Sequence, residues 1–231
     1  MKLLELVGNT HYDIGYDYGT ILGQEMLETY HTFLDRAFPN HLIQHAFELF
    51  LDWQYDNLIY HNVPWEFNEE MRGIQAAGFK NHNSSKLRVL AQRYLVVSSY
   101  PGDFSSDIVY AMVDAFLEQS LKIQNPLLLN YVENNLFAVV KFFKHFLNNK
   151  RIHCSFMATW GSKTKGGKLY TMRNLDWSPN TGMNAHKMIY VWKIKGKIPH
   201  TTIGYPGIIG ALTGMSQAGL TVHEAGLDSM K

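Results

Sequence analysis

Two short runs of sequence decide how this chain folds: RIHCSFMATW at residues 151–160 and LYTMRNLDW at residues 169–177. Between them lies GSKTKGGK at residues 161–168, which is rich in glycine and lysine. Two β-prone runs around a polar glycine turn are typical of a β-hairpin. The first run holds Cys154, the only cysteine of the chain, and the second returns Arg173 and Asp176. The sequence therefore predicts a hairpin with a thiol near its start and a cation and a carboxylate on its returning strand.

The chain changes character at this hairpin. Before residue 150 the apolar residues mostly recur at helical spacing, whereas β-branched residues, aromatic residues and glycines dominate from residue 152 onward. A short strand is expected at 3–7, followed by helices from a cap at Asn9 or Thr10 to residue 61 with a break near Pro39, and then at 66–79, 87–97, 105–121 and 127–148. Strands are expected at 152–160, 168–176, 187–195, 199–204, 207–213 and 219–224. This order predicts the α+β class, with helices in the first two thirds of the chain.

Three glycines in the predicted helices carry expectations of their own. Gly15 and Gly19 are four residues apart, so they share one face of a helix. Each costs about 1 kcal/mol of helix stability relative to alanine. We expect this face to pack closely against another backbone; close approach of a ligand is the alternative. Gly78 is expected to end the helix at 66–79.

Composition narrows the class of protein. The 231 residues are 46% hydrophobic and 18% charged, which is enough apolar material for a core, and the net charge of +1 gives no argument for a nucleic-acid partner. A single cysteine excludes an internal disulfide. No run approaches the roughly 18 apolar residues of a transmembrane span. The start, MKLLELVG, is interrupted too soon for a signal peptide, so a cytoplasmic location is favoured while the compartment stays open.

Cys154 has two interpretations. A free cysteine is often a small buried hydrophobe with no chemical role. A catalytic thiol would need a base, and the eleven histidines are scattered mostly through the helical part of the chain. His153 is adjacent to Cys154, but neighbours on a strand point to opposite faces. Cleavage of the bond before Cys154 would supply a base instead, because the new α-amine would have a pKa of roughly 7.7–8.0 and would sit on the nucleophile's own residue.

Four blocks of sequence resemble N-terminal-nucleophile hydrolases of the penicillin acyltransferase and choloylglycine hydrolase type, including acid ceramidase-like amidases. The first is GNTHYDIGYDYG at 8–19, which is similar to a leader motif, and the second is EMRGIQAA at 70–77, which is similar to a leader helix. The third is Cys154-Ser155 followed by RNLDW at 173–177. The fourth runs from GYPG at 204–207 to GMSQAGLTV at 214–222. Together they extend over nearly the whole chain in the family's order.

The resemblance implies an αββα sandwich, with residues 1–153 as a helical leader and residues 154–231 as the start of the catalytic sheet. It implies self-cleavage between His153 and Cys154, and then hydrolysis or transfer of the acyl group of a small-molecule amide through an acyl-enzyme on Cys154. Arg173 would keep the thiol reactive, since a nearby cation favours the thiolate, and Asp176 would hold the new amine. The alternative for this pair is a surface contact worth about 0–1 kcal/mol.

The remaining site residues implied by the resemblance are Ser216, Trp177 and Tyr205. Ser216 stands where the family has an asparagine that donates to the oxyanion, and losing such a donor typically costs about 10²–10³ in rate. Trp177 and Tyr205 would contact the substrate. No cofactor and no metal site is expected, and a homo-oligomer is left open.

Residues 154–231 supply less sheet than the resemblance leads us to expect, so the chain is interpreted as a fragment or as a shortened member of the family. A shortened member that stays uncleaved and acts as a binding or structural protein is the alternative function. The acyl group and the amine of the substrate are both left open, with fatty-acyl amides, bile-salt-like conjugates, β-lactam side chains and short peptides as candidates.

Overall fold

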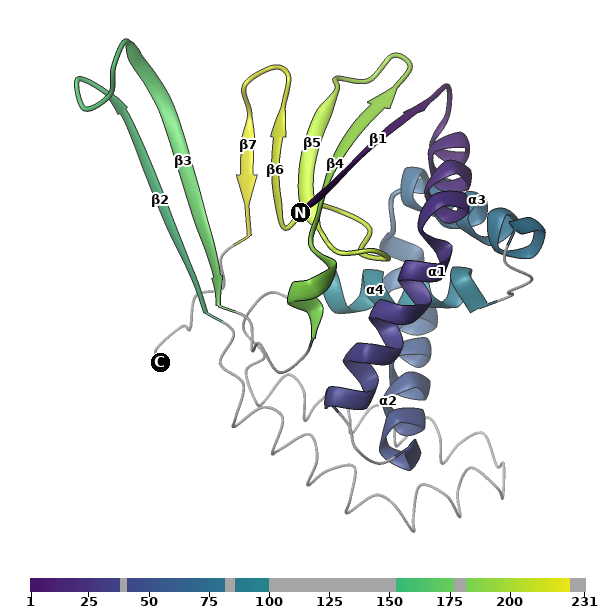
Figure 1. The fold of residues 1–231 in the computed structure, drawn as a ribbon. Coiled ribbons are helices and arrows are strands. Elements are labelled where there is room, and N and C mark those ends of the chain that lie inside the picture. The colour runs from purple at the N-terminus through teal and green to yellow at the C-terminus, as the bar shows by residue number, and fades with distance from the viewer. Residues whose placement is uncertain (38–40, 82–85, 100–152, 177–181, 225–231) are drawn as a thin grey trace.

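The protein has a mixed α/β fold in which helices and strands share one core (Figure 1). The computed structural model describes residues 1–37, 41–81, 86–99, 153–176 and 182–224. Its helices are α1 (His11–Ala37), α2 (His41–Gln54), α3 (Trp65–Asn81) and α4 (Lys86–Ser99), with short helical turns at Tyr55–Ile59, Tyr60–Asn62 and Met183–His186. Its strands are β1 (Lys2–Gly8), β2 (His153–Gly161), β3 (Gly167–Asp176), β4 (Met188–Ile194), β5 (His200–Gly204), β6 (Thr213–Ser216) and β7 (Thr221–His223).

The strands form two sheets. The larger sheet has the order β1-β4-β5-β6-β7; β1 runs parallel to β4, and the other neighbours are antiparallel. The smaller sheet is the β2–β3 hairpin, which confirms the hairpin predicted from the sequence. Because β1 comes from the far N-terminal end and pairs with β4, the part of the chain expected as a leader contributes a strand to the same sheet as β4–β7.

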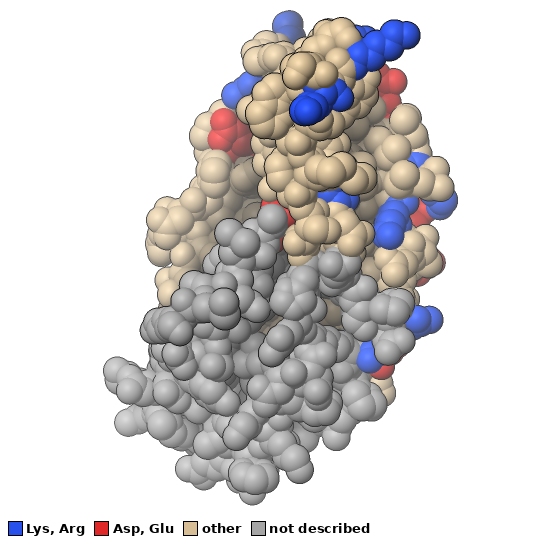
Figure 2. Space-filling view, turned by 90° about the vertical axis from the view of Figure 1, so that its left-hand side faces the viewer, with Lys and Arg blue, Asp and Glu red and all other residues tan. Residues whose placement is uncertain are grey.

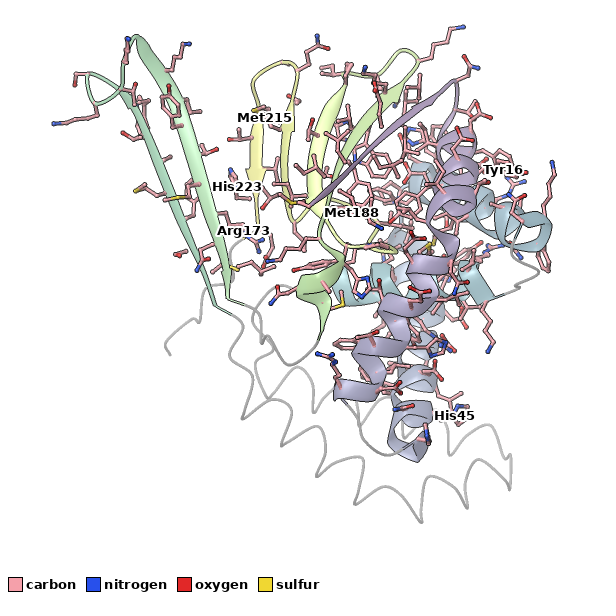
Figure 3. All side chains as sticks on the ribbon, in the orientation of Figure 1. Tyr16, His45, Arg173, Met188, Met215 and His223 are labelled. Carbon is pink, nitrogen blue, oxygen red and sulfur yellow. The ribbon has the colours of Figure 1, made fainter. Side chains whose placement is uncertain are left out.

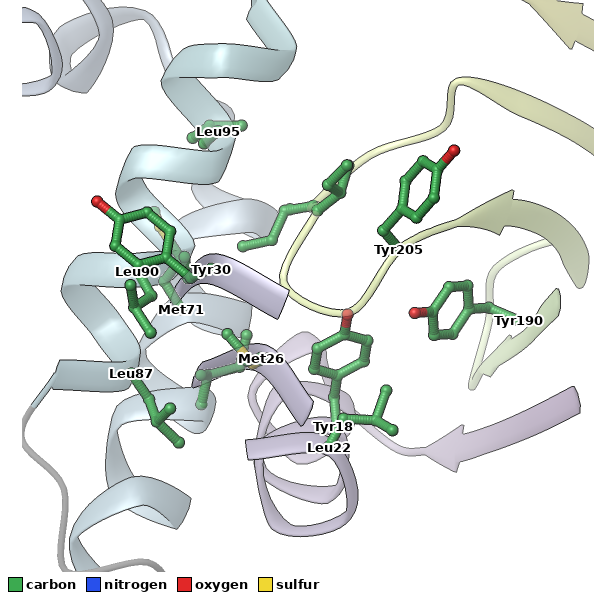
Figure 4. Packing of buried hydrophobic residues seen from close by; sticks show 14 of the residues in the cluster. Tyr18, Leu22, Met26, Tyr30, Met71, Leu87, Leu90, Leu95, Tyr190 and Tyr205 are labelled. Atoms are coloured by element: carbon green, nitrogen blue, oxygen red, sulfur yellow. The ribbon is translucent and has the colours of Figure 1, made fainter. Parts of the chain in front are cut away.

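The two faces of the larger sheet differ in what covers them. Side chains alternate between the faces of a strand, and one set, including Leu6, Tyr190 and Thr202, is buried. Tyr18 of α1 lies on this covered face, where its ring is stacked on Trp192 at 6.0 Å between centroids. Figure 4 shows Tyr18 reaching toward Tyr190 and the loop that follows Tyr205, where its hydroxyl oxygen accepts a hydrogen bond from the Gly207 N–H at 2.7 Å. The opposite face carries four exposed apolar side chains, Leu3, Val7, Ile203 and Met215.

Helices α1 and α3 pack with their backbones in contact, as the spacing of Gly15 and Gly19 predicts. A Cβ atom added to Gly15 would lie 2.0 Å from the carbonyl oxygen of Glu70, and one added to Gly73 would lie 2.2 Å from the carbonyl oxygen of Tyr12. A Cβ atom at Gly19 would lie 2.9 Å from the Cβ of Ala77. Only glycine allows two helices to approach this closely, so the packing interpretation is confirmed.

A buried histidine–glutamate pair lies beside this helix contact. Nδ1 of His11 is 2.8 Å from Oε1 of Glu70, and their side chains are 13% and 12% exposed. The ring of Trp65 packs edge-on against His11 at 5.7 Å. Burial raises the pKa of Glu70, and the hydrogen bond to His11 opposes that rise. The pair therefore joins α1 to α3, and desolvation is the largest effect on the pKa of its carboxyl group.

A charged cluster joins α4 to α1 and α2. Arg93 donates hydrogen bonds to both carboxylate oxygens of Asp52 at 2.7 Å and to Glu48 at 2.5 Å. Its guanidinium also donates to the hydroxyl oxygen of Tyr30 at 3.1 Å, and that hydroxyl donates to Glu48. Burial is the largest effect raising the pKa of Tyr30. Since the arginine side chain is only 14% exposed, the two carboxylates supply the partners that a buried cation needs.

The structure corrects two expectations from the sequence. Gly78 does not end its helix, because α3 continues to Asn81 with Gly78 buried inside it; tertiary packing there outweighs the weak intrinsic preference of glycine. The strand expected at 207–213 begins only at Thr213. Gly207 and Gly210 have φ angles of 97° and 105°, which a strand does not accommodate.

The other expected elements divide into those that the structure confirms and those outside the described residues. The expected strands at 3–7, 152–160, 168–176, 187–195, 199–204 and 219–224 and the helices at 66–79 and 87–97 correspond to observed elements within a few residues. The helical prediction for 10–61 corresponds to α1, α2 and the turns after it, although 38–40 is not described. The helices expected at 105–121 and 127–148 lie outside the described residues.

Candidate functional site

The β2–β3 hairpin brings Cys154 and Arg173 to one face. Cys154 pairs with Leu175, and Phe156 pairs with Arg173. Paired residues and residues two apart share a face of a hairpin, so the thiol and the guanidinium are diagonal neighbours. Nη2 of Arg173 donates a hydrogen bond to Sγ of Cys154 at 3.2 Å. The cation that the sequence placed on the returning strand therefore touches the thiol directly.

Glu224, which directly follows β7, completes a cluster of three groups. Its backbone carbonyl oxygen accepts a hydrogen bond from Nε of Arg173 at 2.5 Å, and its carboxylate accepts a very short one from Nη2. The thiol of Cys154 donates to Oε2 of the same carboxylate at 3.8 Å. The Arg173 side chain is 4% exposed and that of Glu224 is 35% exposed, so a nearly buried cation is matched by a partly open carboxylate.

The hairpin is held against β7 by side chains. The ring of Phe156 packs on the ring of His223 at 5.1 Å, and Nε2 of His223 shares a hydrogen bond with Oγ1 of Thr171 at 3.0 Å. Figure 3 shows Arg173 and His223 close together in the space between the hairpin and β7. Among the described residues, Nδ1 of His223 is buried without a hydrogen-bond partner. These contacts fix the distance between the thiol on β2 and the carboxylate after β7.

Tyr205 is a buried side chain. It follows β5 and is 2% exposed. Burial raises the pKa of its hydroxyl, and the positive charge of Arg173 acts in the opposite direction, so the phenol is close enough to sense the guanidinium. Tyr205 was expected to contact substrate; in this structure its side chain is buried.

Ser216 is placed away from the cluster. It ends β6 at the turn into β7, where its hydroxyl oxygen accepts a hydrogen bond from the Leu220 N–H at 3.2 Å. It lies three residues beyond Thr213, the partner of His223 in the ladder, which corresponds to about 10 Å at roughly 3.3 Å per residue. The structure therefore does not bring the expected oxyanion donor to Cys154, because Ser216 lies at the far end of β6 from the residue that pairs with His223.

The expected cleavage site lies at the start of the described hairpin. His153 and Asp176 form the first pair of the β2–β3 ladder, which places the backbone of both residues next to Cys154. The side chains of His153 and Asp176 lie outside the description, as does all of Trp177.

Sequence reasoning did not select Glu224. It ends the run TVHE on the strand expected at 219–224, and a single carboxylate after a strand is not a distinctive signal. The hydrogen bonds that identify it come from residues 51 and 70 positions earlier in the chain.

Apolar side chains are exposed on both faces of the hairpin. Phe156 is exposed on the face that carries Cys154, Met157, Tyr170 and Met172 are exposed on the other face, and Trp160 and Leu169 are exposed near the tip. Figure 2 faces this side of the molecule and shows its upper, described part as largely uncharged, with lysine or arginine side chains at the top. Cys154 itself is half-buried. An apolar group bound at Phe156, two residues from Cys154 on the same face, would therefore lie next to the thiol.

Within the described ranges, no group of three or more histidine, cysteine, aspartate or glutamate side chains is placed to hold a metal ion. The cluster at Cys154 offers a thiol, a guanidinium and a carboxylate, which are groups suited to nucleophilic and acid–base chemistry. Among the helices that the structure describes, none is long and apolar enough to cross a membrane.

Comparison of the sequence with known proteins gives no relative. No family model matches the chain, and no curated protein matches it. The four blocks of sequence and the geometry around Cys154 are therefore the basis for a functional assignment.

Proposed function

We propose that this protein is a cysteine amidohydrolase or acyltransferase of the N-terminal-nucleophile type, activated by cleavage between His153 and Cys154. The observation that carries the proposal is the 3.2 Å hydrogen bond from a nearly buried Arg173 to Sγ of Cys154. A guanidinium beside a cysteine favours the thiolate, which is the nucleophilic form.

The catalytic steps follow from these groups. Cleavage would leave Cys154 with a free α-amine, which takes the thiol proton as the sulfur attacks the carbonyl carbon of a substrate amide. The amine then gives that proton to the leaving nitrogen, and an acyl group remains on the sulfur. Water or an acceptor amine removes the acyl group. In this scheme Arg173 holds the thiolate and Asp176 orients the amine.

Exposed Phe156, two residues from Cys154 on the same face of β2, supports a substrate with an apolar acyl group. Arg173 is already paired with Glu224, so the described part of the site offers no spare cation there to bind a carboxylate on the substrate. The substrate class that fits is a neutral small-molecule amide whose acyl part is apolar.

The αββα sandwich is part of the same proposal. Helices cover one face of the five-stranded sheet, while Leu3, Val7, Ile203 and Met215 are exposed on the other. Two sheets that pack face to face bury such apolar side chains between them. The exposed face therefore supports a fold in which a second sheet packs on the first.

Cleavage would leave two pieces that remain associated. β1 belongs to the first piece and is paired over its whole length with β4 of the second. The core also contains residues from both pieces, such as Leu6 and Tyr190. The mature protein would therefore be a two-chain molecule that separates only on denaturation.

The test is mass spectrometry of the purified full chain after incubation, under native and denaturing conditions. We expect a new chain that begins at Cys154 and stays bound to residues 1–153, and amidase activity toward neutral fatty-acyl amides. Cys154→Ala should stay intact and inactive. A wild-type chain that folds but remains a single uncut polypeptide without activity would overturn the proposal.

A second function is favoured by one observation. Ser216 lies about 10 Å along the sheet from Thr213, the partner of His223, at roughly 3.3 Å per residue, so the described residues do not bring the expected oxyanion donor to Cys154. An uncut relative that binds a ligand or serves a structural role would need no such donor. Labelling with a reagent specific for N-terminal cysteine separates the two functions, since an uncut chain does not react.

A further inference from the structure

In the proposed activation, the α-amine of Cys154 cannot act as the base for the first step, the self-cleavage. The α-amine of Cys154 becomes available only after the bond to His153 is broken. Before that, the same nitrogen is an amide, which does not accept a proton near neutral pH. The first attack of the thiol therefore needs another proton acceptor, and this acceptor must already be in place in the uncut chain that the structure describes.

Among the described residues, only Arg173 and Glu224 form hydrogen bonds with Sγ of Cys154. Arginine stays protonated and has no lone pair to accept a proton. The ring of His223 is near, but neither of its nitrogens forms a hydrogen bond with Sγ: Nε2 is bonded to Thr171, and Nδ1 is buried without a partner among the described residues. Glu224 is the group that accepts, since the thiol donates to its Oε2 at 3.8 Å.

We infer that Glu224 is the general base, and then the general acid, of self-cleavage in the uncut chain; this inference rests on the proposed function. The thiol proton passes to Oε2 of Glu224 as Sγ bonds to the carbonyl carbon of His153. The bond between that carbon and the nitrogen of Cys154 then breaks, and the nitrogen takes the proton back from Glu224. The product is a thioester, which water hydrolyses to a carboxylate on His153 and a free thiol on Cys154.

The geometry suits both transfers. A cysteine sulfur can reach the carbonyl carbon of the preceding residue through a five-membered ring, so the thiol and the nitrogen that must be protonated are close to each other. Arg173 binds the carbonyl oxygen and the carboxylate of Glu224 and also Sγ, so one cation holds the acceptor and stabilises the developing thiolate. The carboxylate is 35% exposed, which leaves it reachable by the water that completes the hydrolysis.

The experiment compares the rate of cleavage of the full chain in Glu224→Gln with that of the wild type. Glutamine keeps an oxygen that accepts hydrogen bonds from Arg173 but cannot take the thiol proton. We expect cleavage to slow by about 10²–10⁴-fold, the usual contribution of general acid–base catalysis. Glu28→Gln, at an exposed position of α1, is the matched control and should cleave at the wild-type rate.

Hydroxylamine identifies the affected step because it breaks thioesters directly. It should accelerate cleavage of the wild type, and it should fail to rescue Glu224→Gln if the thioester does not form. Rescue of Glu224→Gln by hydroxylamine to the wild-type rate would overturn the inference, because Glu224 would then act only in hydrolysis. Unchanged cleavage in Glu224→Gln without hydroxylamine would overturn it as well.

Two further results separate the loss of a general base from misfolding of the variant and from failure of the proposed function. If Glu224→Gln melts below the wild type, Glu224→Asp serves instead: a carboxylate at that position should restore part of the rate, and a folded Glu224→Asp chain as slow as Glu224→Gln would count against the inference. If the wild type is never cut, the proposed function fails. If the wild type is cut, Cys154→Ala is not and Glu224→Gln is cut normally, only the role of Glu224 fails.

Discussion

Replacing Gly15 by alanine should destabilise the protein even though alanine is the better helix former. The added Cβ would lie 2.0 Å from the carbonyl oxygen of Glu70, whereas ordinary contacts begin at 3.4 Å. The obstacle is backbone, so α1 and α3 would have to separate by roughly 1.4 Å, and a gap of about 1 Å already forfeits up to half of each dispersion contact. Met71 and Ile74 are buried on α3 and would lose part of their packing.

The magnitude follows from two opposing terms. Overpacking costs about 1–3 kcal/mol and occasionally more, and a clash with rigid backbone is at the upper end of that range or beyond it. Alanine recovers about 1 kcal/mol of helix propensity. We therefore expect a net loss of about 2–3 kcal/mol in the free energy of unfolding. For a chain of this length that corresponds to a fall of about 4–12 °C in Tm.

The assay is urea and thermal unfolding followed by circular dichroism, with Asp17→Ala as the control. Asp17 is exposed on the same helix, so its replacement should change stability by no more than about 0.5 kcal/mol. If Gly15→Ala proved as stable as the wild type, or more so, the two helices could not be in backbone contact and the packing argument would be refuted.

Three other substitutions test the site and the core. Arg173→Lys keeps the charge but loses the planar fork, so we expect kcat/KM of the cleaved enzyme to fall by about 10²-fold in an amidase assay; equal activity would remove the argument from the Arg173–Cys154 contact. Arg93→Met leaves the carboxylates of Glu48 and Asp52 without their cation and should cost about 2–4 kcal/mol in urea unfolding, less than for a fully buried pair because Asp52 is partly exposed. Burial raises the pKa of Glu70, so the native state keeps its proton to higher pH than the unfolded state does. The stabilising effect of the protonated Glu70 carboxyl group is fully present below the pKa of the unfolded state and is lost as pH rises through the pKa of the folded state. Glu70→Gln should therefore flatten the pH dependence of Tm in that window, and an unchanged profile would contradict this assignment.

Local sequence patterns predicted much of the fold. The hairpin followed from two β-prone runs around a glycine turn, and its return strand carries Arg173 on the same face as Cys154. The close helix contact followed from the four-residue spacing of Gly15 and Gly19, because that spacing defines one helix face. The errors at Gly78 and at 207–213 arose where a glycine served tertiary packing or a turn rather than its commonest local role.

The sequence by itself determined most of the described helices and strands, and that a thiol and a cation lie on one hairpin, because each of these depends on residues close together in the chain. Only the tertiary structure decided that Glu224 joins them, that Ser216 does not, and that β1 enters the sheet beside β4. Arg173 and Glu224 are 51 residues apart. Whether they touch depends on how the hairpin packs against β7, and that packing is set by contacts between segments that no local pattern encodes.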